Sequence, residues 1–178
     1  MHAFKSACLL MLCLATPAFA AHGHGHEHHA HVHGVAKLEV AVEGGQIDLH
    51  LESPLEALLG FEHAPRSDKE RAVVARMRQS LEQGGRLFAP TAAAGCKLVS
   101  VEVEAAILEA NPTAGDYDEH GDLDADFRFT CAHPGKLTGM EVRLSDAFPG
   151  MRRVDAQVVS GRGQSAARLT TRMRFLSW

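Results

Sequence analysis

The chain has 178 residues, 22% of them charged, and a formal net charge of −4 with its 12 histidines neutral. A mildly acidic chain without a basic patch is a poor candidate for nucleic-acid binding. Its length suits one folded domain with a hydrophobic core.

The first twenty residues have the pattern of a secretory signal peptide. Lys5 gives a weakly basic start, residues 7–15 are an apolar run, and Ala18-Phe19-Ala20 is a small-x-small cleavage site. The apolar run is too short to anchor the chain in a bilayer. We therefore expect cleavage after Ala20 and an exported, soluble protein that is not inserted in the membrane.

Residues 21–34 read AHGHGHEHHAHVHG and contain seven histidines: His22, His24, His26, His28, His29, His31 and His33. Neutral imidazole is the commonest metal ligand in proteins and suits zinc, copper, nickel and iron. The glycines and Glu27 offer no apolar surface to bury, so this segment is predicted to be a flexible, metal-binding tail. A solvated linker is the alternative, and the irregular spacing argues against an affinity tag.

After the tail, the pattern changes to the period of two that is typical of a β-hairpin. The alternating apolar positions are Leu38, Val40, Val42, Ile47, Leu49 and Leu51. Gly44-Gly45 between the two runs fits a type I′ turn. This register places Glu39 opposite His50, and Lys37 opposite Glu52, on the solvent side of the pair.

The same register separates His50 from the tail. His31 and His33 share the solvent side if the first strand extends upstream, but residue 39 lies six positions beyond His33, roughly 20 Å along the strand. We therefore expect His50 to contact Glu39 instead of sharing a metal ion with His33.

A short apolar turn or helix over residues 55–61 should pack on the sheet. Ser67 and Glu70 then form a capping box, which predicts a helix that runs to about Leu81 and ends at Gly84-Gly85. Period-two patterns follow over residues 99–103, 125–131, 140–144, 154–158 and 169–175. The predicted fold is α+β: a mostly antiparallel sheet or sandwich with one capped helix, forming a single globular domain over residues 35–178.

Two cysteines, Cys96 and Cys131, remain after signal cleavage. In an oxidising compartment such a pair is expected to form a disulfide, worth on the order of 3–4 kcal/mol in the chain-entropy model. Zinc bound by both thiolates together with His133 is the alternative.

Residues 116–126 hold six carboxylates and His120. The first half resembles an EF-hand loop, but His120 at position five and Phe127 at position twelve depart from it, which makes calcium a weak interpretation. A loose zinc site and a solvated acidic loop both remain open. His63, just before the predicted helix, is a further candidate ligand, although lone histidines usually serve as hydrogen-bonding residues.

The chain resembles the ZrgA-type family of Gram-negative periplasmic proteins over nearly all of the expected mature chain. The matching runs are His31-Val32-His33-Gly34-Val35-Ala36, Leu51-Glu52-Ser53-Pro54, Gly60-Phe61-Glu62-His63-Ala64-Pro65, Gly95-Cys96, Phe129-Thr130-Cys131, Phe148-Pro149 and residues 158–164. The resemblance implies a periplasmic, zinc-regulated, zinc-binding protein linked to zinc import. Family members often carry a long histidine-rich insertion between the two cysteines. At that place this chain has only the acidic segment with His120. The histidine tail is therefore the main candidate zinc-binding segment.

These observations predict a non-enzymatic protein that captures Zn²⁺ and supports its import through a transporter, with a zinc ABC importer or its solute-binding protein as partner. No nucleophile elbow, phosphate loop or HExxH motif suggests catalysis. The candidate ligands are the seven tail histidines, His63 and His120. The alternatives are an envelope interaction module that docks a partner through residues 55–61, and a buffer for Cu²⁺ or Ni²⁺.

Overall fold

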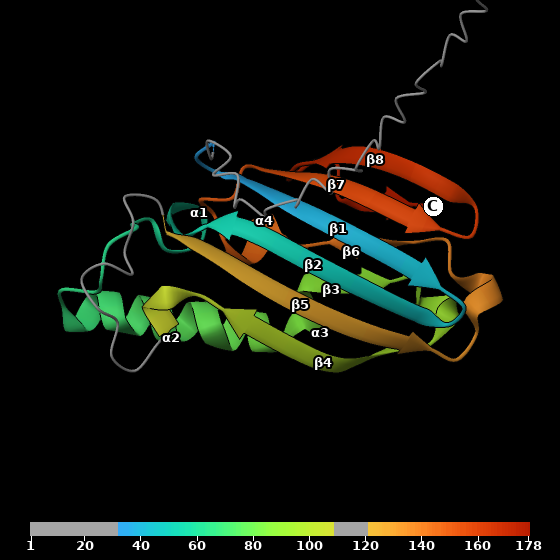
Figure 1. The fold of residues 1–178 in the computed structure, drawn as a ribbon, viewed down its shortest axis with the longest axis horizontal. Coiled ribbons are helices and arrows are strands. Elements are labelled where there is room, and N and C mark those ends of the chain that lie inside the picture. The colour runs from blue at the N-terminus through green and yellow to red at the C-terminus, as the bar shows by residue number, and fades with distance from the viewer. Residues whose placement is uncertain (1–31, 109–120) are drawn as a thin grey trace, which may run out of the picture.

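The computed structural model describes residues 32–108 and 121–178, which form two β-sheets, one longer helix and several short helices (Figure 1). The strands are β1 (Val35–Glu43), β2 (Gln46–Pro54), β3 (Phe88–Pro90), β4 (Cys96–Glu104), β5 (Asp122–Cys131), β6 (Gly139–Val142), β7 (Arg153–Ser160), β8 (Gly163–Leu169) and β9 (Phe175–Ser177). The helices are α1 (Leu55–Leu59), α2 (Asp68–Glu82), α3 (Gly84–Leu87) and α4 (Leu144–Ala147), with 3₁₀ turns η1 (Ala92–Ala94), η2 (Ala106–Leu108) and η3 (Pro134–Lys136). The predicted α+β class is confirmed.

The β1–β2 hairpin has the predicted register. Val42 lies opposite Ile47, and Glu39 opposite His50, because both apolar sets must face the same side of the pair. The turn differs from the prediction. Gly44 has a φ of 57° while Gly45 keeps a negative φ, whereas a type I′ turn needs positive φ at both positions.

The six-stranded sheet has the order β4-β5-β2-β1-β7-β8, and the small sheet has the order β3-β6-β9. All pairs are antiparallel except β1 with β7, where Val35 lies opposite Arg153 and Val42 opposite Ser160 in parallel. Side chains alternate with a period of two in both kinds of pair, so the sequence pattern could not reveal this parallel contact.

The expected strand over residues 169–175 is wrong. β8 ends at Leu169, and the Thr170 hydroxyl then accepts hydrogen bonds from the backbone N–H groups of Arg172 and Met173, which bends the chain before β9 starts at Phe175. Strand β8 lies outside the predicted strands, because GQSAARL has no apolar alternation and no β-branched or aromatic side chain. The expected strand over 140–144 ends at Val142, and Leu144 begins α4.

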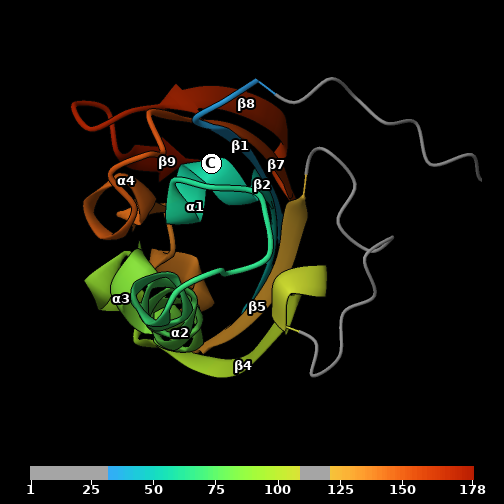
Figure 2. The same cartoon turned by 90° about the vertical axis from the view of Figure 1, so that its left-hand side faces the viewer.

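Helices α1 to α4 and the small sheet all lie on one side of the large sheet (Figure 2). The hydroxyl of Ser67 accepts the N–H of Glu70 at 3.2 Å, which confirms the predicted cap of α2. The buried side chains Val74, Met77 and Leu81 of α2 face the core. Phe88 of the small sheet meets Phe127 of the large sheet edge to face, with ring centroids 4.8 Å apart, so the two sheets share one core.

The predicted disulfide between Cys96 and Cys131 is confirmed. The two cysteines lie directly opposite each other on β4 and β5. Because β4 is an edge strand that pairs only with β5 in the six-stranded sheet, the bond fixes the end of the sheet. Among the described residues, no helix has the length and apolar character needed to cross a membrane.

Candidate metal-binding residues

The root of the histidine tail is held firmly on the fold. Gly34 has a φ of 73°, and a side chain there would approach the Gly150 carbonyl oxygen at 2.8 Å. The Gly34 carbonyl accepts the N–H groups of Arg152 and Arg153, and the Arg152 guanidinium donates to the His33 carbonyl at 2.6 Å. His33 is therefore anchored by its backbone at the start of β1 and is exposed to solvent. The other tail histidines, His22, His24, His26, His28, His29 and His31, lie outside the described residues, as do residues 1–20.

His63 sits in the connection between α1 and α2. Its ring stacks on Phe61 with centroids 5.1 Å apart, and its Nδ1 lies 2.9 Å from the Ala64 carbonyl oxygen. This contact leaves Nε2 as the nitrogen available to a metal ion. His120 lies outside the described residues. Its neighbour Gly121 accepts the N–H of Leu55 through its carbonyl, so β5 begins beside α1.

The Cys–His alternative is not supported. Both sulfurs are used in the Cys96–Cys131 bond, and a disulfide sulfur is not a thiolate ligand. His133 is exposed, and its backbone N–H donates to the Ala94 carbonyl at 2.9 Å.

The second half of the acidic segment is part of the sheet. Asp122, Asp124 and Asp126 lie on β5, where an extended strand turns them to one face. A calcium loop would need to coil around the ion over these positions, so the EF-hand interpretation is wrong for this half. The first half, with Asp116, Asp118, Glu119 and His120, lies outside the described residues.

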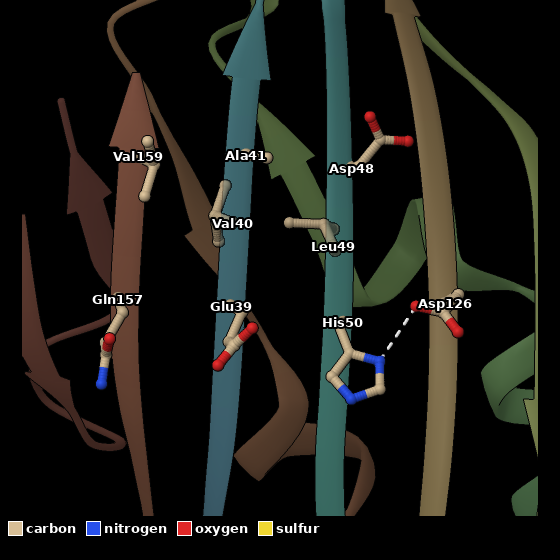
Figure 3. Close-up of a pocket in the computed structure, with 9 residues that line it drawn as sticks. All are labelled: Glu39, Val40, Ala41, Asp48, Leu49, His50, Asp126, Gln157 and Val159. Atoms are coloured by element: carbon tan, nitrogen blue, oxygen red, sulfur yellow. Dashed lines mark hydrogen bonds and ion pairs between the residues drawn. The ribbon is translucent and has the colours of Figure 1, made fainter. Parts of the chain in front are cut away.

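His50 is the histidine with the most acidic surroundings among the described residues, and the sequence analysis did not select it as a ligand. Its Nδ1 lies 3.0 Å from Asp126 Oδ1, and its Nε2 lies 3.7 Å from Asp124 Oδ1. Glu39 lies on the opposite side of the ring from Asp126 (Figure 3). The predicted partner, Glu39, is thus a neighbour, but the hydrogen bond goes to β5.

The charges around His50 shift its ionisation. Partial burial lowers the pKa of His50, but the hydrogen bond and negative charge of Asp126, helped by Asp124 and Glu39, outweigh burial and leave the pKa raised. Burial raises the pKa of the Asp124 carboxyl; the charge of His50 opposes this shift, and that of Glu52 adds to it. Crowded carboxylates on an exposed face favour a bound cation.

A hollow of about 280 Å³ lies beside this ring on the outer face of the large sheet, between β7, β1, β2 and β5. Its polar lining comes from Glu39, Asp48, His50, Asp126 and Gln157 (Figure 3). The described residues alone do not close a metal site here or elsewhere, because no group of three or more His, Cys, Asp or Glu side chains among them is arranged to hold an ion.

The apolar segment 55–61 does not offer a docking surface. Leu55, Ala57 and Leu58 are buried, and Leu59 and Phe61 pack against the same core. The interaction-module alternative therefore loses the feature on which it was based.

A family model described as "ZrgA family zinc uptake protein" matches residues 30–178, which is most of the chain and all of its described part. No curated protein matches the chain.

Proposed function

This chain belongs to the ZrgA family of zinc uptake proteins, and from that membership we propose that it is a periplasmic, non-enzymatic protein that captures Zn²⁺ on its histidine tail and hands it to an importer. The observation that carries the proposal is the concentration of seven histidines in residues 21–34, next to a matched family region. Imidazole is a ligand of zinc, and a ligand set that does not enclose the ion suits its transfer to another protein better than a closed four-ligand site does.

The folded part is consistent with zinc binding by the tail and not by the core. The core of the described part is built from apolar side chains and a disulfide, which supports the proposal that the domain folds before zinc is bound. The tail starts at a root that Arg152 and Gly34 hold in place, so a variant changed only at the upstream histidines keeps the residues that form these root contacts. A zinc ABC importer, or its solute-binding protein, is the proposed recipient.

The cellular test replaces tail histidines and leaves the root intact. In a variant with His22, His24, His26, His28, His29 and His31 all changed to Ala, cells should grow more slowly than wild type in zinc-limited medium and equally well when zinc is added. The matched control is His133→Ala, which removes an exposed histidine away from the tail. Unimpaired growth of the tail variant under zinc limitation, with the protein present at wild-type level, would contradict the proposal.

A further inference from the structure

The small sheet has one face in the core and one face turned away from it. Met140 of β6 and Leu176 of β9 are buried in the core. Because side chains alternate along a strand, Ala89, Glu141 and Phe175 lie in a row on the opposite face. A hollow of about 480 Å³ lies over this row, and we call it the β6 groove.

One end of the β6 groove is cationic, with a lining from Arg143, Arg172 and Arg174. The Val142 N–H donates to the Arg174 carbonyl at 2.9 Å, which holds β6 and the segment before β9 together at this end. The Thr170 hydroxyl accepts the Arg172 N–H at 3.3 Å. Backbone contacts thus fix the chain that carries these arginines.

The positive charge of this end is only partly balanced. Arg143 donates from Nη2 to Glu141 Oε2 at 2.6 Å. Arg174 pairs with Asp146, whereas Arg172 forms no ion pair with another described residue. The hydrogen bond and charge of Arg143, with the charge of Arg174, lower the pKa of Glu141, in agreement with a positive field here. A guanidinium has five N–H donors, so all three arginines keep donors for a further carboxylate.

The other end of the β6 groove is apolar. Pro90 and Ala92 line it together with Phe175, which is 56% exposed. A side chain at Gly139 would lie 2.8 Å from Phe175 Cζ, so the glycine lets the ring lie close over β6. The run Arg172-Met173-Arg174-Phe175 combines the residue types, arginine, methionine and aromatic, that are enriched in protein–protein interfaces.

We propose that the β6 groove binds an extended segment of a partner protein in which an acidic side chain lies next to an aromatic or aliphatic one. The carboxylate accepts hydrogen bonds from Arg143 and Arg172, and the apolar side chain packs on Phe175. A free anion would fill only the cationic end and leave Phe175 bare, and a flat lipid surface would not enter the hollow. The groove lies outside the histidine tail, so this inference goes beyond the proposed capture of zinc and does not depend on it.

The test titrates the full chain with a blocked peptide that has one phenylalanine between two pairs of glutamates, and follows the chemical shifts by NMR. The Nε–H signals of Arg143 and Arg172 and the backbone amides of β6 and β9 should shift together and saturate. A peptide with glutamine in place of each glutamate, and one with glycine in place of phenylalanine, should each bind at least about tenfold more weakly. The absence of a saturable shift at millimolar peptide would overturn the proposal.

Variants separate binding in the groove from general charge attraction. Arg172→Gln and Phe175→Ala should each weaken peptide binding about tenfold, because they remove a charged donor and the apolar contact, respectively. The matched controls are Arg76→Gln on the exposed side of α2 and Met173→Ala, an exposed residue outside the groove lining, and both should bind as wild type does. All four variants should keep the circular dichroism spectrum of the wild type. Equal losses in groove variants and controls, or no loss in the groove variants, would overturn the proposal.

Two further measurements separate this groove from the tail and from a membrane. The zinc affinity of Arg172→Gln should equal that of the wild type, and a lower affinity would contradict the independence of the groove from the tail. Cosedimentation with phosphatidylglycerol vesicles that Arg172→Gln abolishes, without any shift induced by the peptide, would assign this surface to a membrane and overturn the proposal.

Discussion

Removal of the Cys96–Cys131 bond is expected to destabilise the fold without removing the zinc-binding function. The bond joins residues 35 positions apart, and in the chain-entropy model a loop of that length is worth about 4 kcal/mol. The effect should be concentrated at the edge of the sheet, because β4 pairs only with β5 there. The double variant Cys96→Ala/Cys131→Ala should therefore unfold at a clearly lower urea concentration.

The assay is urea unfolding followed by circular dichroism. The single variant Cys96→Ala is the matched control: it breaks the same bond and should lose a similar amount. The dependence on urea should become steeper, because an unfolded chain without the cross-link exposes more surface. A loss below about 1 kcal/mol would refute the loop-closure reasoning. Loss of zinc binding in a variant that remains folded would refute the separation of the tail from the core.

Four further expectations follow from the same residues. Because zinc must displace protons from imidazoles with an ordinary pKa of about 6.5, zinc affinity should fall steeply between about pH 7 and pH 5, as titration calorimetry can show; equal affinity at both ends would point to carboxylate ligands. An NMR titration should find the pKa of His50 raised and should find it lowered in Asp126→Asn; a group of this kind stabilises the fold below its unfolded pKa of about 6.5, and that small contribution is lost as pH rises through the folded pKa. Phe127→Ala should cost about 3–5 kcal/mol in urea unfolding, since the ring is buried against Phe88 and Gly84. The metal-free protein should show the circular dichroism spectrum of a folded β-rich protein, and saturating zinc should change its urea midpoint little, because the tail histidines also bind zinc in the unfolded chain.

Local chemistry made several elements predictable from the sequence. The hairpin register follows from two alternating apolar runs around Gly44-Gly45, and the start of α2 follows from the Ser67 side chain that caps it. The disulfide followed from the count of cysteines outside the expected signal peptide. In each case the interacting residues are close in sequence, or the number of possible partners is small.

Contacts between distant segments could not be read in this way. The parallel pairing of β1 with β7 and the weakly patterned strand β8 depend on the whole topology. For the same reason, the sequence placed Glu39 beside His50 but could not show that β5 brings Asp126 and Asp124 to its other side. One signal was present: Asp122, Asp124 and Asp126 alternate with Leu123 and Ala125, which is the pattern of a strand with one acidic face.

The central claim is tested most directly by the zinc affinity and stoichiometry of the chain purified without a metal-affinity step. Chelator competition should show tight zinc binding by the wild-type chain. Binding should be at least a hundredfold weaker when His22, His24, His26, His28, His29 and His31 are all Ala, while the circular dichroism spectrum stays the same. Equal affinity and stoichiometry in the two proteins would contradict the account, because zinc would then be held by residues outside the tail.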